Sequence, residues 1–169
     1  RVGGIAGALQ ALREAGWTPG VISRGYSGAS SHAPRPVLAS SHASDVGDEP
    51  LQIQRATGAP VFVAQRRIDA GRALRLAHPE VNVVLTDDGL QHWALHRDVS
   101  VVVMDDRGVG NGWLLPAGLL REPWPPTPQN WPSLVLHQRP KHQPSAECPM
   151  PAGLPRFEAT RSLSPWAIN

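Results

Sequence analysis

The sequence predicts an α/β fold built on a mostly parallel β-sheet with flanking helices. Short apolar stretches rich in valine and isoleucine recur along the chain, and segments with apolar residues at helical spacing separate them. Strands that alternate with helices in this way are typical of a parallel sheet. The 169 residues suffice for one domain, or for one domain and part of a second. No stretch approaches the roughly 18 apolar residues of a membrane-spanning helix.

The expected elements follow from these patterns in chain order. They are a helix at 5–15, a strand at 21–23, a loop at 27–44 with a short strand at 36–38, a helix from 48 to 57, a strand at 61–63, a helix at 68–77, and strands at 81–85, 99–104 and 134–136. Apolar residues at helical spacing define the first and third helices. The helix that begins at Asp48 is indicated by two acidic residues and Pro50, which suit a first helical turn.

Glycine and proline together number 34 of the 169 residues (16 Gly and 18 Pro), and they are most frequent after residue 107. This composition predicts loops around the strand at 134–136. We therefore expect a core domain over residues 1–136 and an irregular connection over 137–169 that leads towards a missing second domain.

Charge and cysteine content exclude several classes of protein. The net charge is +2, with basic and acidic residues evenly mixed, so nothing indicates a nucleic-acid partner. The single cysteine, Cys148, excludes an internal disulfide and a zinc site built on cysteines. His92 and His96 lie four residues apart, but without a third ligand this spacing does not favour zinc over two ordinary histidines.

Ligands of open parallel sheets bind at the carboxyl ends of the strands, so polar residues that follow apolar strands are the best candidates for a site. Four segments qualify, namely 23–26, 45–49, 87–92 and 105–111. The strongest is 87–92, because an apolar strand that ends in Asp87 and Asp88 has the Walker B arrangement, in which a carboxylate holds Mg²⁺ beside a nucleotide phosphate. The alternative is an acidic turn in which Asp87 caps a helix.

Asp48 and Glu49 form a second carboxylate pair, suited either to deprotonating a hydroxyl in phosphoryl transfer or to stabilising a helix N-terminus. Arginines can bind phosphate oxygens with two hydrogen bonds, although single arginines more often lie solvated on the surface. The candidates are Arg24, Arg66 or Arg67, and Arg121.

In order and spacing, the motifs of this chain resemble tetraacyldisaccharide 4′-kinase, the lipid A 4′-kinase of Gram-negative bacteria. The matching segments are 21–26, 46–50, 87–92, 110–112, 114–118 and 120–123. The resemblance implies a P-loop-kinase-like fold and an enzyme that uses ATP and Mg²⁺ to phosphorylate the 4′-hydroxyl of a tetraacylated glucosamine disaccharide 1-phosphate. It also implies action at a membrane surface, on the cytoplasmic face of the bacterial inner membrane.

The same resemblance implies a role for individual residues. Asp48 matches the residue that activates the sugar hydroxyl, and Asp87 and Asp88 match the Mg²⁺ carboxylates. The other implied catalytic residues are Glu49, Gln91, Arg121 and Glu122, and the implied ATP-binding residues are Arg24 and Arg67.

The chain departs from the family pattern in its phosphate loop. A Walker A loop reads G-x-x-x-x-G-K-[ST], whereas this sequence has no lysine before Lys141, and Ile5 and Ala6 follow Gly3 and Gly4. We therefore expect a fragment truncated at both ends, without kinase turnover by itself and possible to handle in solution. The alternatives are a non-catalytic remnant that binds a lipid sugar or a nucleotide, and a Mg²⁺-dependent phosphohydrolase that uses Asp48 and Asp87.

Overall fold

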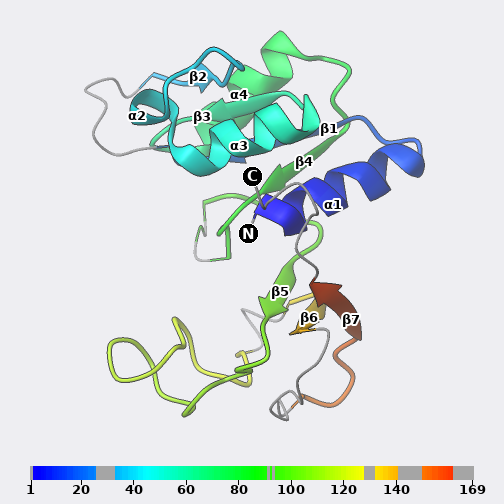
Figure 1. Cartoon of the computed structure of the whole chain (residues 1–169), viewed down its shortest axis with the longest axis vertical. Coiled ribbons are helices and arrows are strands. Elements are labelled where there is room, and N and C mark those ends of the chain that lie inside the picture. The colour runs from blue at the N-terminus through cyan, green and yellow to red at the C-terminus, as the bar shows by residue number, and fades with distance from the viewer. Residues whose placement is uncertain are drawn as a thin grey trace. The chain divides into compact units, whose positions relative to one another are not determined.

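The computed structural model describes residues 2–25, 33–90, 92, 94–127, 132–140 and 150–161. The chain divides into two compact units, Arg1–Leu95 and His96–Asn169 (Figure 1). The boundary near residue 95 was not indicated by the sequence. The boundary expected after residue 136 falls inside a strand, Leu134–Pro140.

The first unit is built on a sheet that, among the described residues, has four strands in the order β2-β3-β1-β4. The central strand β1 (Pro19–Ser23) pairs in parallel with β3 (Val61–Val63) and with β4 (Val83–Thr86). The short strand β2 (Arg35–Pro36) is antiparallel to β3. The predicted α/β class with a mostly parallel sheet is thereby confirmed.

Helices cover both faces of this sheet. Consecutive residues of a strand point to opposite faces, so each strand can pack against helices on both sides. Val21 and Val61 pack with Leu9 of α1 (Val2–Glu14) and Ile53 of α3 (Asp48–Thr57) in one buried cluster. Their strand neighbours Ile22 and Phe62 pack in a second cluster with Leu74 of α4 (Arg67–Ala77). The strands β1 and β3 are buried on both faces, which explains why they appear in the sequence as continuous apolar stretches, whereas β4 is only partly buried.

The second unit contains a parallel sheet with the order β5-β6-β7 among the described residues. Its strands are β5 (Val101–Met104), β6 (Leu134–Pro140) and β7 (Arg156–Arg161). Met104, Val135 and Leu154 form its buried cluster. The expectation that 137–169 is irregular is wrong for residues 137–140 and 156–161, which pair as neighbouring strands.

Other differences from the expected elements are small. The helix α2 (Ala43–Val46) begins within the last residues of the loop expected at 27–44, and the short strand expected at 36–38 is found at Arg35–Pro36. The strand expected at 81–85 begins instead at Val83, although Val81 is buried next to it. None of the helices in the described part of the chain is long and apolar enough to cross a membrane.

Candidate functional site

Three strand ends of the first unit lie at one edge of the sheet and carry the candidate residues. The register pairs Ser23 with Val63 and Ile22 with Thr86, so β1, β3 and β4 end within one residue of the same level. Arg24 directly follows β1, and Asp87 directly follows β4. The topology thus brings to one edge the residues that sequence patterns had placed after separate strands.

Arg67, the first residue of α4, is the central side chain of this cluster. It is 6% exposed, although it was expected to be a phosphate-binding arginine. Its Nη2 donates to the carbonyl oxygen of Asp87 over 3.0 Å and to that of Asp88 over 3.4 Å. Its Nη1 makes a hydrogen bond to Nε2 of His92. A side chain from the start of α4 therefore contacts both sides of the turn that follows β4.

Burial also shapes the electrostatics of the cluster. It lowers the pKa of the Arg67 guanidinium below its usual value, while the carboxylates of Asp88 and Asp87 oppose the shift. Burial, with the positive charges of Arg67 and Arg24, likewise lowers the pKa of His92. A neutral His92 can accept the Arg67 hydrogen bond at Nε2, so the contact and the direction of the shift agree.

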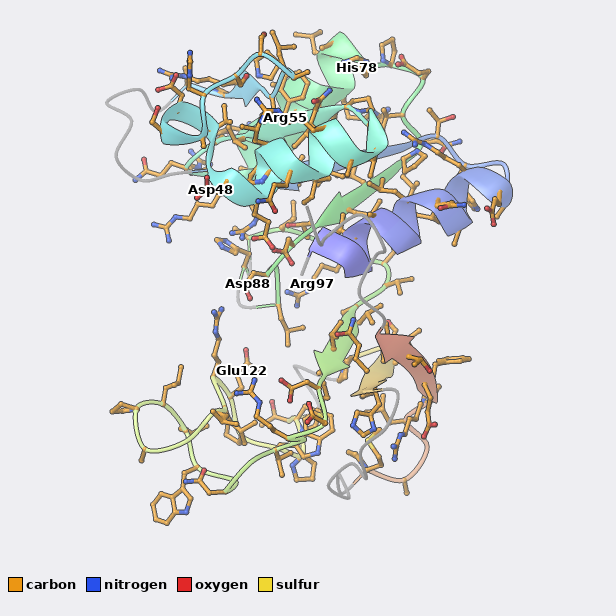
Figure 2. All side chains as sticks on the ribbon, in the orientation of Figure 1. Asp48, Arg55, His78, Asp88, Arg97 and Glu122 are labelled. Atoms are coloured by element: carbon orange, nitrogen blue, oxygen red, sulfur yellow. The ribbon has the colours of Figure 1, made fainter. Side chains whose placement is uncertain are left out.

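The turn that carries the two carboxylates is conformationally specific. Asp88 has a φ of 52°, the left-handed region that residues other than glycine seldom adopt. At Gly89 an added Cβ would lie 2.6 Å from Cγ2 of Thr86, so no larger residue fits without a shift. Figure 2 labels Asp88 at this turn. Among the described residues, no hydrogen bond or ion pair to the Asp87 carboxylate is found.

Asp48 and Glu49 occupy the first turn of α3, as the sequence predicted. The preceding Gly47 has a φ of 92°, which allows α2 to end and α3 to begin at a single residue. Asp48 is exposed (Figure 2), and no hydrogen bond to its carboxylate comes from the described residues. A carboxylate at a helix N-terminus is favoured by the helix dipole, and an exposed one can also accept a proton from a bound hydroxyl.

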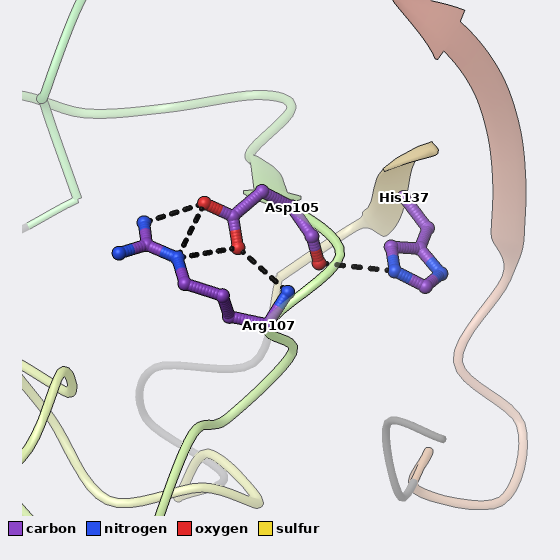
Figure 3. A network of polar contacts seen from close by, with 3 residues as sticks. All are labelled: Asp105, Arg107 and His137. Carbon is purple, nitrogen blue, oxygen red and sulfur yellow. Dashed lines mark hydrogen bonds and ion pairs between the residues drawn. The ribbon is translucent and has the colours of Figure 1, made fainter. Parts of the chain in front are cut away.

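The second unit holds a polar network of which the sequence indicated only the segment 105–111 (Figure 3). His137 is 1% exposed on β6, and its Nε2 lies 3.0 Å from the carbonyl oxygen of Asp105, the residue after β5. Its Nδ1 lies 2.6 Å from Nη2 of Arg156. Arg107 binds the Asp105 carboxylate with two nitrogens, and this pairing raises the pKa of Arg107. The sequence indicated Asp105 and Arg107, because the segment 105–111 follows an apolar strand, but it did not indicate His137 or Arg156.

Arg121 and Glu122 lie in the long loop between β5 and β6 of the second unit, where Figure 2 labels Glu122. Arg121 is exposed and Glu122 is half-buried. Gln91 lies outside the described residues. The structure thus brings together Arg24, Arg67, Asp87 and Asp88, and it describes Arg121 and Glu122 within the other unit.

The described residues contain no group of three or more histidine, cysteine, aspartate or glutamate side chains that could hold a metal ion. The Asp87–Asp88 pair nevertheless offers oxygen donors of the kind that Mg²⁺ prefers. Mg²⁺ commonly keeps several waters and takes one or two carboxylates together with phosphate oxygens of a substrate. The chemistry of these two carboxylates is therefore compatible with Mg²⁺.

Comparison with known proteins shows one consistent likeness. A family model described as tetraacyldisaccharide-1-P 4′-kinase matches residues 5–166. The tetraacyldisaccharide 4′-kinase of Acidovorax sp. (strain JS42) is 54% identical over 158 residues, which cover 94% of this chain and 43% of that protein. The enzyme of the same name from Dechloromonas aromatica is 60% identical over 112 residues, which cover 66% of this chain and 33% of that protein.

A solved structure shares the fold. The crystal structure of the "apo" form of LpxK from Aquifex aeolicus in complex with ATP matches with a TM-score of 0.70 and 22% identity. The match covers 93% of this chain and 48% of that one. The chain therefore spans less than half the length of the relatives that it matches.

Proposed function

Since the chain belongs to the tetraacyldisaccharide-1-P 4′-kinase family, we propose that its protein transfers a phosphoryl group from ATP to the 4′-hydroxyl of a tetraacylated glucosamine disaccharide 1-phosphate. This reaction is a step of lipid A biosynthesis, and the substrate is an amphiphile at a membrane surface. The observation that carries the proposal is the family match over residues 5–166, which includes every candidate site residue. The solved relative was crystallised in complex with ATP, which supports the choice of phosphoryl donor.

Asp87 and Asp88 are the proposed Mg²⁺ ligands. The ion, when bound, neutralises charge on the phosphates of ATP and on the transferring phosphoryl group. The turn after β4 supplies the two carboxylates, and Arg67 makes hydrogen bonds to its carbonyl oxygens. Arg24, beside the same edge, is a proposed contact for the nucleotide phosphates, because a guanidinium can bind phosphate oxygens with two hydrogen bonds.

Asp48 is the proposed base that accepts the proton of the sugar 4′-hydroxyl. Its exposure and the lack of a hydrogen-bond partner among the described residues leave the carboxylate able to receive that proton. Glu49, Gln91, Arg121 and Glu122 are the remaining residues that we propose for the active site, on the family match. A guanidinium such as that of Arg121 would stabilise negative charge in the transition state.

A chimera tests the proposed function directly. Residues 5–166 would replace the matched region of the Acidovorax relative, and transfer of labelled phosphate from ATP to the tetraacyl disaccharide 1-phosphate would be measured. We expect 4′-phosphorylation by the chimera and its loss in the Asp48→Asn chimera. A folded chimera that is inactive on this substrate, beside an active parent enzyme, would contradict the proposal.

A second candidate is binding of the lipid sugar or of a nucleotide without turnover. The observation that favours it is that the 169 residues contain no G-x-x-x-x-G-K-[ST] motif. Calorimetric titration of the chain with ATP and with the disaccharide, alongside a kinase assay, separates the two functions. Binding without turnover by both the chain and the chimera would favour the second candidate.

A further inference from the structure

We propose that Arg67 is a positioning residue: its guanidinium holds the turn that carries Asp87 and Asp88, and thereby sets where the two carboxylates lie, instead of contacting ATP. This inference rests on the proposed function, in which the two carboxylates hold Mg²⁺. It changes the role that the sequence indicated for Arg67, which was to bind the nucleotide.

The guanidinium of Arg67 is buried and makes its hydrogen bonds to other groups of the protein. With the residue 6% exposed, little of the guanidinium faces solvent from which a phosphate could approach. Nη2 donates hydrogen bonds to the carbonyl oxygens of Asp87 and Asp88, and Nη1 donates one to His92. The third nitrogen, Nε, is buried without a hydrogen-bond partner in the described residues. Burying an unpaired donor costs free energy. The hydrogen bonds to the two carbonyl oxygens offset part of that cost.

The two carbonyl contacts fix the backbone of Asp88. The Asp87 carbonyl belongs to the peptide plane before the Cα of Asp88, and the Asp88 carbonyl belongs to the plane after it. A single nitrogen that binds both oxygens therefore restrains φ and ψ of Asp88 together. This matters because Asp88 has a φ of 52°, which costs free energy for a residue other than glycine and persists only when its surroundings enforce it.

The cation also acts on the charges that the turn displays. Two adjacent carboxylates repel each other, and a nearby guanidinium reduces this repulsion. Because Arg67 approaches from the carbonyl side, it can do so without occupying the carboxylate oxygens that a metal ion needs. Residues that orient metal ligands typically change metal affinity by about 10–100-fold when they are replaced.

The test combines native-state hydrogen exchange with titration by Mn²⁺ alone, an ion with similar oxygen ligands. The variants are Arg67→Met and Arg67→Lys, and Arg66→Met is the matched control because the Arg66 side chain is 74% exposed and pairs only with Asp69 among the described residues. In Arg67→Met we expect exchange of the amides of residues 88–90 to be at least about tenfold faster, and Mn²⁺ affinity to fall about 10–100-fold. Amides in the middle of α1 should be unchanged.

Arg67→Lys keeps the charge but cannot hold both carbonyls and His92 together, so its effects should be intermediate. It also provides the test if Arg67→Met fails to fold. Unchanged exchange at residues 88–90 in the folded Arg67 variants would overturn the inference. So would equal effects in Arg66→Met, or a loss of metal-free ATP binding without any change in exchange at the turn.

Asp87→Asn separates this inference from the proposed function. If Asp87→Asn weakens Mn²⁺ binding and Arg67→Met does not, the positioning role is wrong and the proposed metal site stands. If Mn²⁺ binds equally well to Asp87→Asn and to the unsubstituted chain, the proposed metal site is wrong. In that case, faster hydrogen exchange at residues 88–90 in the Arg67 variants would still show that the native Arg67 side chain holds the turn.

Discussion

Asn111 and Ala117 are joined across the long loop of the second unit, where the Asn111 Nδ2 donates to the Ala117 carbonyl oxygen over 3.0 Å. The Oδ1 of the same amide accepts from the backbone nitrogen of Trp113 over 3.1 Å. A Cβ on Gly118 would lie 2.1 Å from the Trp113 carbonyl oxygen and 2.4 Å from Asn111 Oδ1. These contacts explain part of the motif at 110–118 by loop structure, with no chemical role required.

Asn111→Ala should loosen this loop. The substitution removes two hydrogen bonds, each worth about 1 kcal/mol, and the loop backbone between residues 113 and 120 should open more often. We expect faster trypsin cleavage after the exposed Arg121 while global unfolding in urea changes little. Gln52→Ala, at an exposed position of α3, is the control. Equal cleavage rates in the two variants would show that the amide does not hold the loop.

His92 should make folding pH-dependent below neutrality. Its folded-state pKa is lowered from 6.5 by burial and by the charges of Arg67 and Arg24. The unfolded chain therefore takes up the proton first as the pH falls, so this stability is fully present above pH 6.5 and is lost as the pH falls towards the folded-state pKa.

His92→Gln should flatten that part of the stability profile, as measured by urea unfolding at several pH values on either side of 6.5. His96→Gln, with a side chain that is 88% exposed, is the comparison variant. The burial of His92 would not explain the pH dependence if the His92→Gln profile kept the slope of the unsubstituted chain.

How far the sequence predicts this structure depends on whether an element is decided locally. Two acids and a proline suffice to start α3 at Asp48, and the apolar stretch of β4 places Asp87 at its end. The strand β7 has no such apolar stretch in its sequence. Its Phe157 is exposed, and the segment becomes a strand through its pairing with β6. A polar segment of this kind is defined by its partner strand.

The same distinction holds for the site. The position of Asp87 and Asp88 at the end of β4 was predicted, because they directly follow an apolar stretch in the sequence. The burial of Arg67 was not, since an arginine at a helix start is usually solvated. Its location depends on how α4 packs on the sheet and on the distance to a turn twenty residues away in sequence, which single-sequence patterns do not encode.

The 169-residue chain by itself should show no kinase turnover. A phosphate loop stabilises charge on the transferring phosphoryl group with backbone N–H groups and a lysine, and losing one preorganised donor already costs about 10²–10³ in rate. This sequence has no lysine before Lys141. Release of labelled 4′-phosphorylated disaccharide by the purified chain, above a no-enzyme control, would disprove this expectation.

Vesicle binding by the same chain should be weak or undetectable. Basic residues near an anionic membrane contribute about 1 kcal/mol each, and a net charge of +2 supplies little such attraction. The exposed Trp113 and Leu115 are the apolar side chains to examine if the chain does bind. Co-sedimentation with anionic vesicles at physiological salt is the measurement, and Trp113→Ala would then test that loop.

The carboxylates should separate by role in the chimera with the Acidovorax relative. Asp87→Asn or Asp88→Asn removes a proposed ligand, so activity should require more Mg²⁺, because a hard cation depends on anionic oxygen donors. Asp48→Asn should lower kcat by about 10²–10⁴, the usual contribution of a general base, with the Mg²⁺ and ATP requirements nearly unchanged.

Asp45→Asn is the matched control, since this exposed carboxylate lies three residues before Asp48 in the preceding helix α2. If Asp48 only stabilised the N-terminus of α3 through the helix dipole, its loss would cost about 0.3–1 kcal/mol of stability and leave turnover per folded molecule intact. Steady-state kinetics with Mg²⁺ titrations, corrected for the folded fraction, decide between these roles. Near-normal kcat in Asp48→Asn would remove the base from the mechanism, and an unchanged Mg²⁺ requirement in both Asp87→Asn and Asp88→Asn would remove the metal ligands.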